Sequence, residues 1–173
     1  MDYFNQESKR LIFRKLTLKD ISAWALFFKE NNRIHFLGID TSKSDLELAT
    51  DWVLRQLQRY SESGFGHLAV IKKTTHEFVG MGGIIPRIVD GKKEFEIAYS
   101  ILPEYWNKGF ATEIAQQLKR FGLSELQLPR MISIIAVNND DSVNVARKNG
   151  MKLRNITNYL GMEVEVYAVE SCK

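Results

Sequence analysis

Cysteine is almost absent from this sequence, which has one, Cys172, next to the C-terminal residue. A lone cysteine cannot form a disulfide within the chain, so a domain held together by disulfides is excluded and a reducing compartment is favoured. Apolar runs of membrane-spanning length are also missing, and the opening residues MDYFNQESKR lack the apolar core of a signal peptide. We therefore expect a cytoplasmic protein with no membrane partner.

An excess of charge of one sign is missing as well. The 24 basic and 21 acidic residues leave a net charge of only +3, and the two signs are interspersed along the chain. This balance argues against direct binding of nucleic acid. The histidines His35, His67 and His76 do not stand at the spacing of metal ligands, so we predict no metal site.

What the chain does have is a succession of strand-like and helix-like segments. No repeat, low-complexity segment or linker interrupts it, and 45% of its 173 residues are hydrophobic. We therefore expect one α/β domain spanning residues 1–173 on a mixed sheet. The pair Asp90-Gly91 should form a hairpin turn. The expected strands cover residues 10–14, 67–73, 77–89, 93–101, 130–137 and two segments within 152–170.

Local signals mark the ends of the expected helices. Thr17 to Asp20 and Ser44 to Glu47 each resemble a capping box, which predicts a helix after each. The second of these helices should end near Gly64, because glycine is typical just after a helix. Two further helices are expected at about 109–126 and 141–149.

The stretch PEYWNKGFATE, residues 103–113, places a single glycine where a helix should begin. The first amides of a helix lack partners within it, and the helix dipole adds partial positive charge there. Gly109 would let an anionic ligand approach the backbone, and Lys108 adds a full charge. The simpler alternative is a tight turn between strand and helix, because such turns are common. The spacing alone leaves both interpretations open.

A second stretch, NNDDSVNVARKNGM at residues 138–151, follows a buried strand in a similar way. In an ordinary helix, Asp140 or Asp141 would cap the start and Gly150 would end it. The residues that recur in it at intervals of three, three and two are Ser142, Val145, Lys148 and Gly150.

Together and in this order, the two stretches resemble the GNAT superfamily of acetyl-coenzyme A (acetyl-CoA) dependent N-acetyltransferases. The segment from Trp106 to Ala111 occupies the place of the superfamily's cofactor loop, with Trp106 where glutamine or arginine is usual. That departure resembles the RimJ/RimL-like branch, which acetylates the N-termini of ribosomal proteins. The resemblance extends from Leu11 to Val169. It implies a mixed, mostly antiparallel α/β (α+β) sheet of about seven strands, flanked by about four helices.

The resemblance also implies where acetyl-CoA binds. The pyrophosphate would rest on the loop, and the pantetheine arm would run beside the end of the strand 93–101. In the family, a bulge makes this strand diverge from the strand that here holds Ile134 to Val137. Asn139 would contact the pantetheine amides, and no metal is implied. The implied cofactor-binding residues are Ile101, Leu102, Asn107, Lys108, Gly109, Phe110, Ala111, Thr112, Asn139 and Ser142.

Three catalytic roles follow from the resemblance. The amide of Ile101 is a candidate donor to the thioester oxygen, the hydroxyl of Ser142 could reach the sulfur, and Glu96 is a candidate base for the amine proton. The alternatives are local, since Ser142 can serve the start of its helix and Glu96 can be a solvated strand charge like Glu94. Many relatives carry a tyrosine acid where this chain has Ala146. Ser142 or water would then assist the thiolate, or it would leave unaided.

We therefore expect an acetyl-CoA-dependent N-acetyltransferase in which a primary amine attacks directly in a ternary complex. The absence of a positioned cysteine argues against an acyl-enzyme. The acceptor would be a protein N-terminus, such as that of a ribosomal protein, or a small-molecule amine, and the protein a monomer or homodimer. The alternative is a catalytically inactive acyl-CoA-binding sensor or regulatory module, with which Ala146 is compatible. A nucleotide-binding domain fits poorly, because the chain has neither a P-loop nor a dinucleotide-binding fingerprint.

Overall fold

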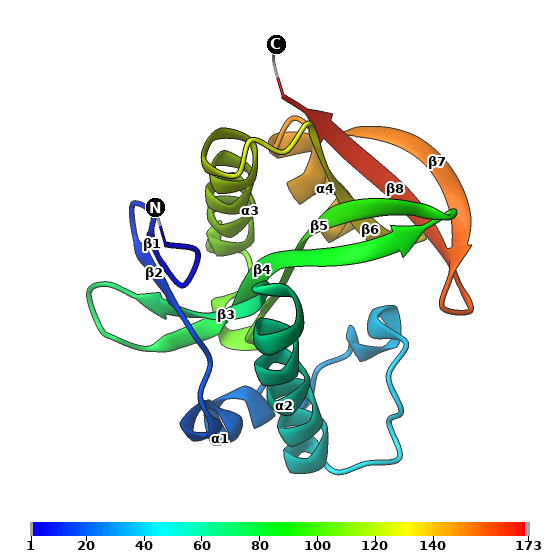
Figure 1. The fold of residues 1–173 in the computed structure, drawn as a ribbon. Helices are drawn as coiled ribbons and strands as arrows, with labels where there is room; N and C mark the ends of the chain where they lie inside the picture. The colour runs from blue at the N-terminus through cyan, green and yellow to red at the C-terminus, as the bar shows by residue number, and fades with distance from the viewer. Residues whose placement is uncertain (1, 172–173) are drawn as a thin grey trace.

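The computed structural model describes residues 2–171, in which an eight-stranded sheet carries helices on both sides (Figure 1). The spatial order is β1-β2-β3-β4-β5-β6-β8-β7, and all neighbours are antiparallel except β5 and β6. Cys172 lies outside the described residues. The strands are β1 Asn5–Glu7, β2 Leu11–Arg14, β3 Gly66–Lys72, β4 Phe78–Val89, β5 Lys92–Ile101, β6 Arg130–Ala136, β7 Lys152–Tyr159 and β8 Met162–Glu170.

The sequence predicts seven strands, and the structure largely agrees. All seven form, and β1 is an additional strand that pairs with β2 at the edge of the sheet. Its three residues are too few to show the alternation that indicates a strand. The predicted hairpin between β4 and β5 turns at Asp90 and Gly91, whose φ angles of 48° and 73° are both positive. That backbone suits the tight hairpin turn for which Asp-Gly is preferred.

Four α-helices accompany the sheet, as the sequence predicts. Both capping boxes form, and Ser44 Oγ accepts from the amide of Glu47 at 3.3 Å. The helix after the first box is shorter than its apolar pattern suggests, because it ends at Ala25 and leaves the buried Phe28 on a turn. Phe121–Glu125 continues α3 as a π-helical segment. The α-helices are α1 Ile21–Ala25, α2 Asp45–Ser63, α3 Phe110–Arg120 and α4 Asp140–Lys148.

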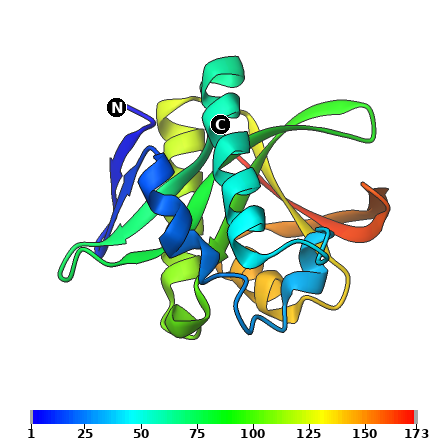
Figure 2. The same cartoon turned by 90° about the horizontal axis from the view of Figure 1, so that it is seen from below.

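The helices form two layers around the sheet. α1 and α2 lie on one side, while α3 lies on the opposite side with α4 beside it (Figures 1 and 2). α3 packs closely on the strands, since a Cβ on Gly82 of β4 would approach Ile114 Cγ2 to 2.4 Å. The main core lies between these layers and includes the fully buried Phe13, Trp24 and Leu118.

The middle of the sheet opens between its two parallel strands. Glu96 of β5 and Ile132 of β6 are the only residues of these strands paired in register within the described chain. Beyond them the strands diverge, and a cavity described below lies between their ends. The divergence is implied by the family resemblance, but the implied bulge in β5 is wrong, because β5 pairs with β4 in unbroken register from Lys92 to Ile101. The nearby register shift lies between β3 and β4, where Val70 and Ile71 pair with Gly80 and Phe78.

Candidate active site

The loop before α3 has the left-handed backbone that its glycine permits. Gly109 is the N-cap residue of α3 with a φ of 77°, and Asn107 has a φ of 60°. A Cβ on Gly109 would meet only one described atom within 4 Å, Arg10 Nη2 at 3.6 Å. The backbone conformation, rather than crowding, therefore favours glycine here. The tight turn and the accessible backbone, which the sequence left as alternatives, occur together.

Beyond this loop, the start of α3 faces open space. The amides of Phe110, Ala111 and Thr112 begin the helix and have no carbonyl one turn earlier to bind. A cavity of about 320 Å³, here called the loop cavity, lies against them. Lys148 from α4 also lines it, which adds a positive charge beside the partial charge of the helix. The predicted cofactor residues that line this cavity are Ile101, Asn107, Gly109, Phe110, Ala111 and Thr112.

Two predicted cofactor residues lie differently. Leu102 is buried, and its amide donates to the carbonyl of Val79 at 3.0 Å. Lys108 points its ammonium group over the ring of Tyr105, 5.2 Å from the centroid. Neither is among the side chains that line the loop cavity in the described chain. Lys148, which the sequence showed within the second motif, takes the position expected of Lys108.

Arg10 supports the loop before α3 through contacts to its backbone and to the first residue of the helix. Its Nη1 donates to the carbonyl of Lys108 at 3.0 Å, and its guanidinium lies 4.3 Å from the centroid of the Phe110 ring. Glu113, in the first turn of α3, accepts from Nε of Arg10 at 2.5 Å and from Ser8 Oγ at 2.6 Å. These contacts hold the loop in one conformation without using the first amides of α3.

Two more cavities continue from the loop cavity into the sheet. The central cavity, of about 130 Å³, shares Ile101, Trp106 and Asp141 with the loop cavity. The inner cavity, of about 210 Å³, lies between the diverging ends of β5 and β6 and shares Tyr99 and Ser142 with the central one. The shared walls make a line of cavities from the start of α3 to the middle of the sheet.

The backbone of β5 presents hydrogen-bonding groups to this line. Because Leu102 donates to β4, strand alternation turns the amides of Tyr99 and Ile101 to the opposite side, toward β6. Two carbonyls confirm the direction, since Ile97 accepts from Ser133 Oγ at 3.1 Å and Ile101 accepts from Trp106 Nε1 at 2.9 Å. The predicted amide of Ile101 therefore faces the cleft, as does the amide of Tyr99.

The start of α4 forms the opposite wall. Asn139 is its N-cap, and Asn139 Oδ1 accepts from the amide of Ser142 at 3.3 Å. The expectation that Asp140 or Asp141 caps this helix is wrong, because both lie in its first turn. Asn139 and Ser142 line the central and inner cavities, so the cap keeps its amide group and the serine hydroxyl beside the cleft.

Tyr99 is a side chain that the sequence reasoning did not single out. It lines the central and inner cavities together with Ser142, and its hydroxyl lies near the Ser142 hydroxyl. Burial raises the pKa of this hydroxyl, so it stays protonated at neutral pH. Ala146, where many relatives carry a tyrosine, is 2% exposed within the core. A tyrosine hydroxyl thus reaches this region from β5 instead of from α4.

Glu96 lies at the point where β5 and β6 part. The residue is 7% exposed and lines the inner cavity, so the alternative of a solvated strand charge is wrong. Arg87 of β4 donates from Nε to Glu96 Oε2 at 2.7 Å, and Oε1 has no hydrogen bond among the described residues. Glu94 is not solvated either, because it is buried and pairs with Arg130 of β6.

The inner cavity has aromatic walls and a buried histidine. Phe36 and Trp52 line it from the helical layer. His67 Nδ1 accepts from Trp52 Nε1 at 3.2 Å, while Nε2 is buried without a partner in the described chain. Burial lowers the pKa of His67 to about 3, and the charges of Arg59 and Arg87 act in the same direction. His67 is therefore neutral, with Nε2 carrying the proton.

Residues 2–171 contain no group of three or more histidine and acidic side chains placed to hold a metal ion. None of the helices in that range combines the length and apolar character needed to cross a bilayer.

The opened sheet and the glycine loop at the start of α3 are features that the GNAT resemblance implies. A family model for the acetyltransferase (GNAT) domain matches residues 10–152, and the chain belongs to this family. The predicted fold class and the predicted N-acetyltransferase class of enzyme are thereby confirmed.

Individual relatives agree with this assignment. The chain is 27% identical over 146 residues to YoaA of Bacillus subtilis strain 168, an uncharacterized N-acetyltransferase, covering 84% of this chain and 81% of YoaA. An acetyltransferase structure from Agrobacterium tumefaciens strain C58 matches with a TM-score of 0.80 at 22% identity, over 96% of this chain and 94% of that one. The ribosomal alpha-N-protein acetyltransferase RimL, solved in complex with coenzyme A, matches with a TM-score of 0.74 at 17% identity, over 95% and 96% of the two chains.

Proposed function

We propose that this protein transfers the acetyl group of acetyl-CoA to a primary amine by direct attack in a ternary complex. The observation that carries the proposal is the line of cavities from the start of α3 to the carboxylate of Glu96. The acceptor is a protein N-terminus or a small-molecule amine, and the similarity to RimL supports the former. Residues 1–173 act as one cytoplasmic domain, monomeric or homodimeric, without a membrane or nucleic-acid partner.

The residues around the loop cavity suit acetyl-CoA. Its pyrophosphate would accept hydrogen bonds from the free amides of residues 110–112, with Lys148 nearby as a counter-charge. The pantetheine arm would continue through the central cavity beside Ile101, where the cleft-facing backbone of β5 can bind its amides. This path brings the thioester to Tyr99 and Ser142 at the border of the inner cavity.

Glu96 is the proposed general base. An ammonium group must lose a proton before its nitrogen can attack, and Oε1 of Glu96 is available for that proton while Arg87 holds Oε2. The aromatic inner cavity would receive the amine beside this carboxylate. The amine nitrogen then forms a bond to the thioester carbonyl carbon.

The tetrahedral intermediate carries a negative oxygen that needs hydrogen-bond donors. The amide of Ile101 is the predicted donor. The amide of Tyr99, two residues nearer to Glu96, faces the same side of β5. Backbone donors fixed in a sheet require no reorganisation as the charge develops. Collapse of the intermediate breaks the carbon–sulfur bond, releases the coenzyme A thiolate and lets the second amine proton leave to water, which gives the neutral amide.

Tyr99 and Ser142 stabilise this thiolate. The Tyr99 hydroxyl has a pKa above its usual value of about 10, whereas a thiol has a pKa of about 8.5. Tyr99 therefore keeps its proton at equilibrium and acts as a hydrogen-bond donor to sulfur, with the final proton coming from water. This hydroxyl supplies the assistance that Ala146 cannot give.

An inactive acyl-CoA-binding module is the second candidate, because Ala146 leaves no acid on α4. Titration calorimetry of the protein with acetyl-CoA, beside ATP and NAD, tests the binding that both candidates require. Thiol release in a panel of amines, including short peptides with free N-termini, then separates them. We expect turnover that falls in Glu96→Gln and Ser142→Ala. Binding without turnover of any amine would favour the inactive module, and unchanged turnover in both variants would refute the catalytic roles.

A further inference from the structure

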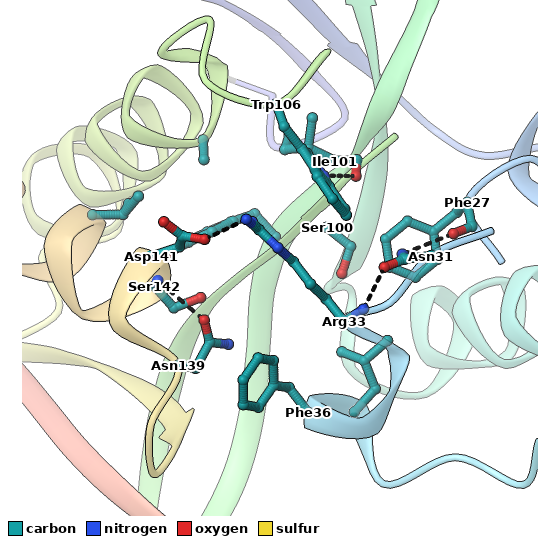
Figure 3. Close-up of a pocket in the computed structure, with 14 residues that line it drawn as sticks. Phe27, Asn31, Arg33, Phe36, Ser100, Ile101, Trp106, Asn139, Asp141 and Ser142 are labelled. Carbon is teal, nitrogen blue, oxygen red and sulfur yellow. Dashed lines mark hydrogen bonds and ion pairs between the residues drawn. The ribbon is translucent and has the colours of Figure 1, made fainter. Parts of the chain in front are cut away.

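Arg33 crosses the cleft between the two helical layers (Figure 3). Its backbone belongs to the segment between α1 and α2, on the side of Phe36. Its side chain reaches across to α4, where Nη2 lies 2.6 Å from Asp141 Oδ2. On the way, its guanidinium lies 4.1 Å from the centroid of the Trp106 ring, which belongs to the loop before α3.

The base of Arg33 is fixed by a buried asparagine. Asn31 is 7% exposed, and its Nδ2 donates to the carbonyl of Phe27 at 2.8 Å. Asn31 Oδ1 in turn accepts from the backbone amide of Arg33 at 2.8 Å. The backbone is therefore held close to the cleft, while the long side chain can exchange partners.

The guanidinium lies on the proposed route of the coenzyme. Arg33, Trp106 and Asp141 each line both the loop cavity and the central cavity, so their contact marks the border between the two. A pantetheine arm that joins the start of α3 to Ser142 must pass this border. The contact in the free protein and a bound coenzyme therefore compete for the same place.

The Arg33–Asp141 ion pair is weak enough for Arg33 to change partners. The two side chains are 38% and 57% exposed, and a pair this open to water contributes little to stability. A diphosphate resting on the amides of residues 110–112 would bring more negative charge than one carboxylate and geometry that suits the arginine fork. Arg33 would gain by turning from Asp141 to the phosphates.

We propose that Arg33 is a coenzyme-binding residue that Asp141 holds across the cleft until a diphosphate replaces it. The inference rests on the proposed function, because it assumes that acetyl-CoA occupies the line of cavities. Arg33 then contributes binding energy from the segment between α1 and α2, and its movement opens the passage for the pantetheine arm. The two members of one ion pair therefore have opposite effects on the affinity for acetyl-CoA.

Calorimetry with two ligands tests this inference. Acetyl-CoA carries the diphosphate, and S-acetylpantetheine has the same thioester arm without phosphate. We expect Arg33→Met to weaken acetyl-CoA binding about 10-fold, the loss of one charge-assisted contact. The same variant should bind S-acetylpantetheine as well as the wild type or better. Asp141→Asn should strengthen acetyl-CoA binding by up to about 3-fold, because it removes a competing pair of small energy.

A matched pair far from the cleft supplies the control. Arg154 and Glu170 join β7 and β8 with an Nη2 to Oε1 distance of 2.5 Å and side chains that are 47% and 57% exposed. Arg154→Met and Glu170→Gln should leave both affinities unchanged. Arg33→Lys, which keeps the charge but not the planar fork, should give an affinity for acetyl-CoA between those of the wild type and Arg33→Met.

The outcomes separate the two levels of the argument. If the wild type does not bind acetyl-CoA, the proposed function fails. If the wild type binds but Arg33→Met behaves like Arg154→Met, the inference alone fails. It also fails if Arg33→Met and Asp141→Asn weaken acetyl-CoA binding together, which would indicate a purely structural pair. Should Arg33→Met not fold, Arg33→Lys and Asp141→Asn still give the required opposite signs.

Discussion

Glu94 and Glu96 stand two residues apart on the same face of β5, and they resemble each other closely. They are 8% and 7% exposed, and each pairs with an arginine. The difference is the strand that supplies the arginine. Glu94 pairs with Arg130 of β6 and ties β5 to its parallel neighbour, whereas Glu96 pairs with Arg87 of β4 and leaves the β6 side open.

This difference separates a structural carboxylate from a candidate catalytic one. Burial and an ion pair are common to both, so neither property identifies a base. What distinguishes Glu96 is its place opposite Ile132, the one β6 residue that pairs with β5 in the described chain, and its Oε1, which has no hydrogen bond there and lies beside the inner cavity. A buried carboxylate can act as a base where the two strands diverge and leave a cavity beside it.

The most direct way to break this comparison is to neutralise each glutamate in turn. We expect Glu96→Gln to lower kcat about 100-fold or more, because removal of a positioned general base costs about 10²–10⁴ in rate. Glu94→Gln should change kcat less than about 3-fold. Steady-state rates of thiol release with one amine and both variants measure the contrast.

Thermal or denaturant unfolding supplies the control. Glu94→Gln should destabilise the fold by about 1–2 kcal/mol, less than the roughly 3–5 kcal/mol for breaking a buried pair, because Arg130 is 37% exposed. Equal losses of activity in the two variants would mean that the carboxylates act alike and that the comparison is wrong.

The second prediction concerns His67, a second titratable group that lines the inner cavity with Glu96. Its pKa of about 3 in the folded protein lies below the value of about 6.5 in an unfolded chain. The unfolded state therefore binds the proton first, and the stability due to His67 is present above pH 6.5 and lost as the pH falls toward 3. Between pH 7 and 5 the wild type should lose about 2 kcal/mol more than His67→Gln.

Urea unfolding at a series of pH values measures that difference. The same pH dependence in wild type and His67→Gln would contradict a neutral, buried histidine. It would also return His67 to consideration as a base, which would weaken the case for Glu96. A difference of the expected sign leaves Glu96 as the stronger candidate in this cavity.

The third prediction separates the leaving group from the base. Tyr99→Phe should lower kcat about 10-fold with little change in KM for the amine, because it removes one hydrogen bond to a charged atom. Tyr105 lines only the loop cavity among the three cavities, so Tyr105→Phe should leave kcat unchanged. Unchanged kcat in Tyr99→Phe would remove Tyr99 from the mechanism without affecting the role of Glu96.

Much of the fold follows from local signals in the sequence. Asp90-Gly91 predicts its hairpin and Ser44 to Glu47 its helix start, because both depend on residues adjacent in the chain. The regular register of β5 against β4 and the end of α1 at Ala25 do not follow in this way. They depend on how distant elements pack, which overrides local preference.

The residues of the candidate site likewise divide into those that local sequence signals predict and those that depend on how distant segments pack. The glycine loop and Ser142 lie in motifs and could be predicted. Tyr99, His67 and Arg33 could not, because β5, β3 and the segment after α1 meet only in the folded chain. One signal was present for Tyr99, which alternates with Ile101 along β5 and therefore shares its direction. The buried pairing of Glu94 had no comparable signal, since its partner Arg130 lies on β6.

The smallest expected effect belongs to Ser142, and it tests how far the reaction beside Glu96 depends on α4. Ser142→Ala removes a hydroxyl near that of Tyr99, but the backbone amide of residue 142 still bonds to Asn139 Oδ1, so the helix start should persist. We expect kcat to fall about 3-fold, which corresponds to about 0.7 kcal/mol and lies within the roughly 0.5–1.5 kcal/mol of a neutral hydrogen bond. The double variant with Tyr99→Phe should lose little more than Tyr99→Phe alone, since the two hydroxyls act as a unit. A fully additive loss in thiol-release assays would instead indicate that Ser142 contacts the sulfur independently of Tyr99.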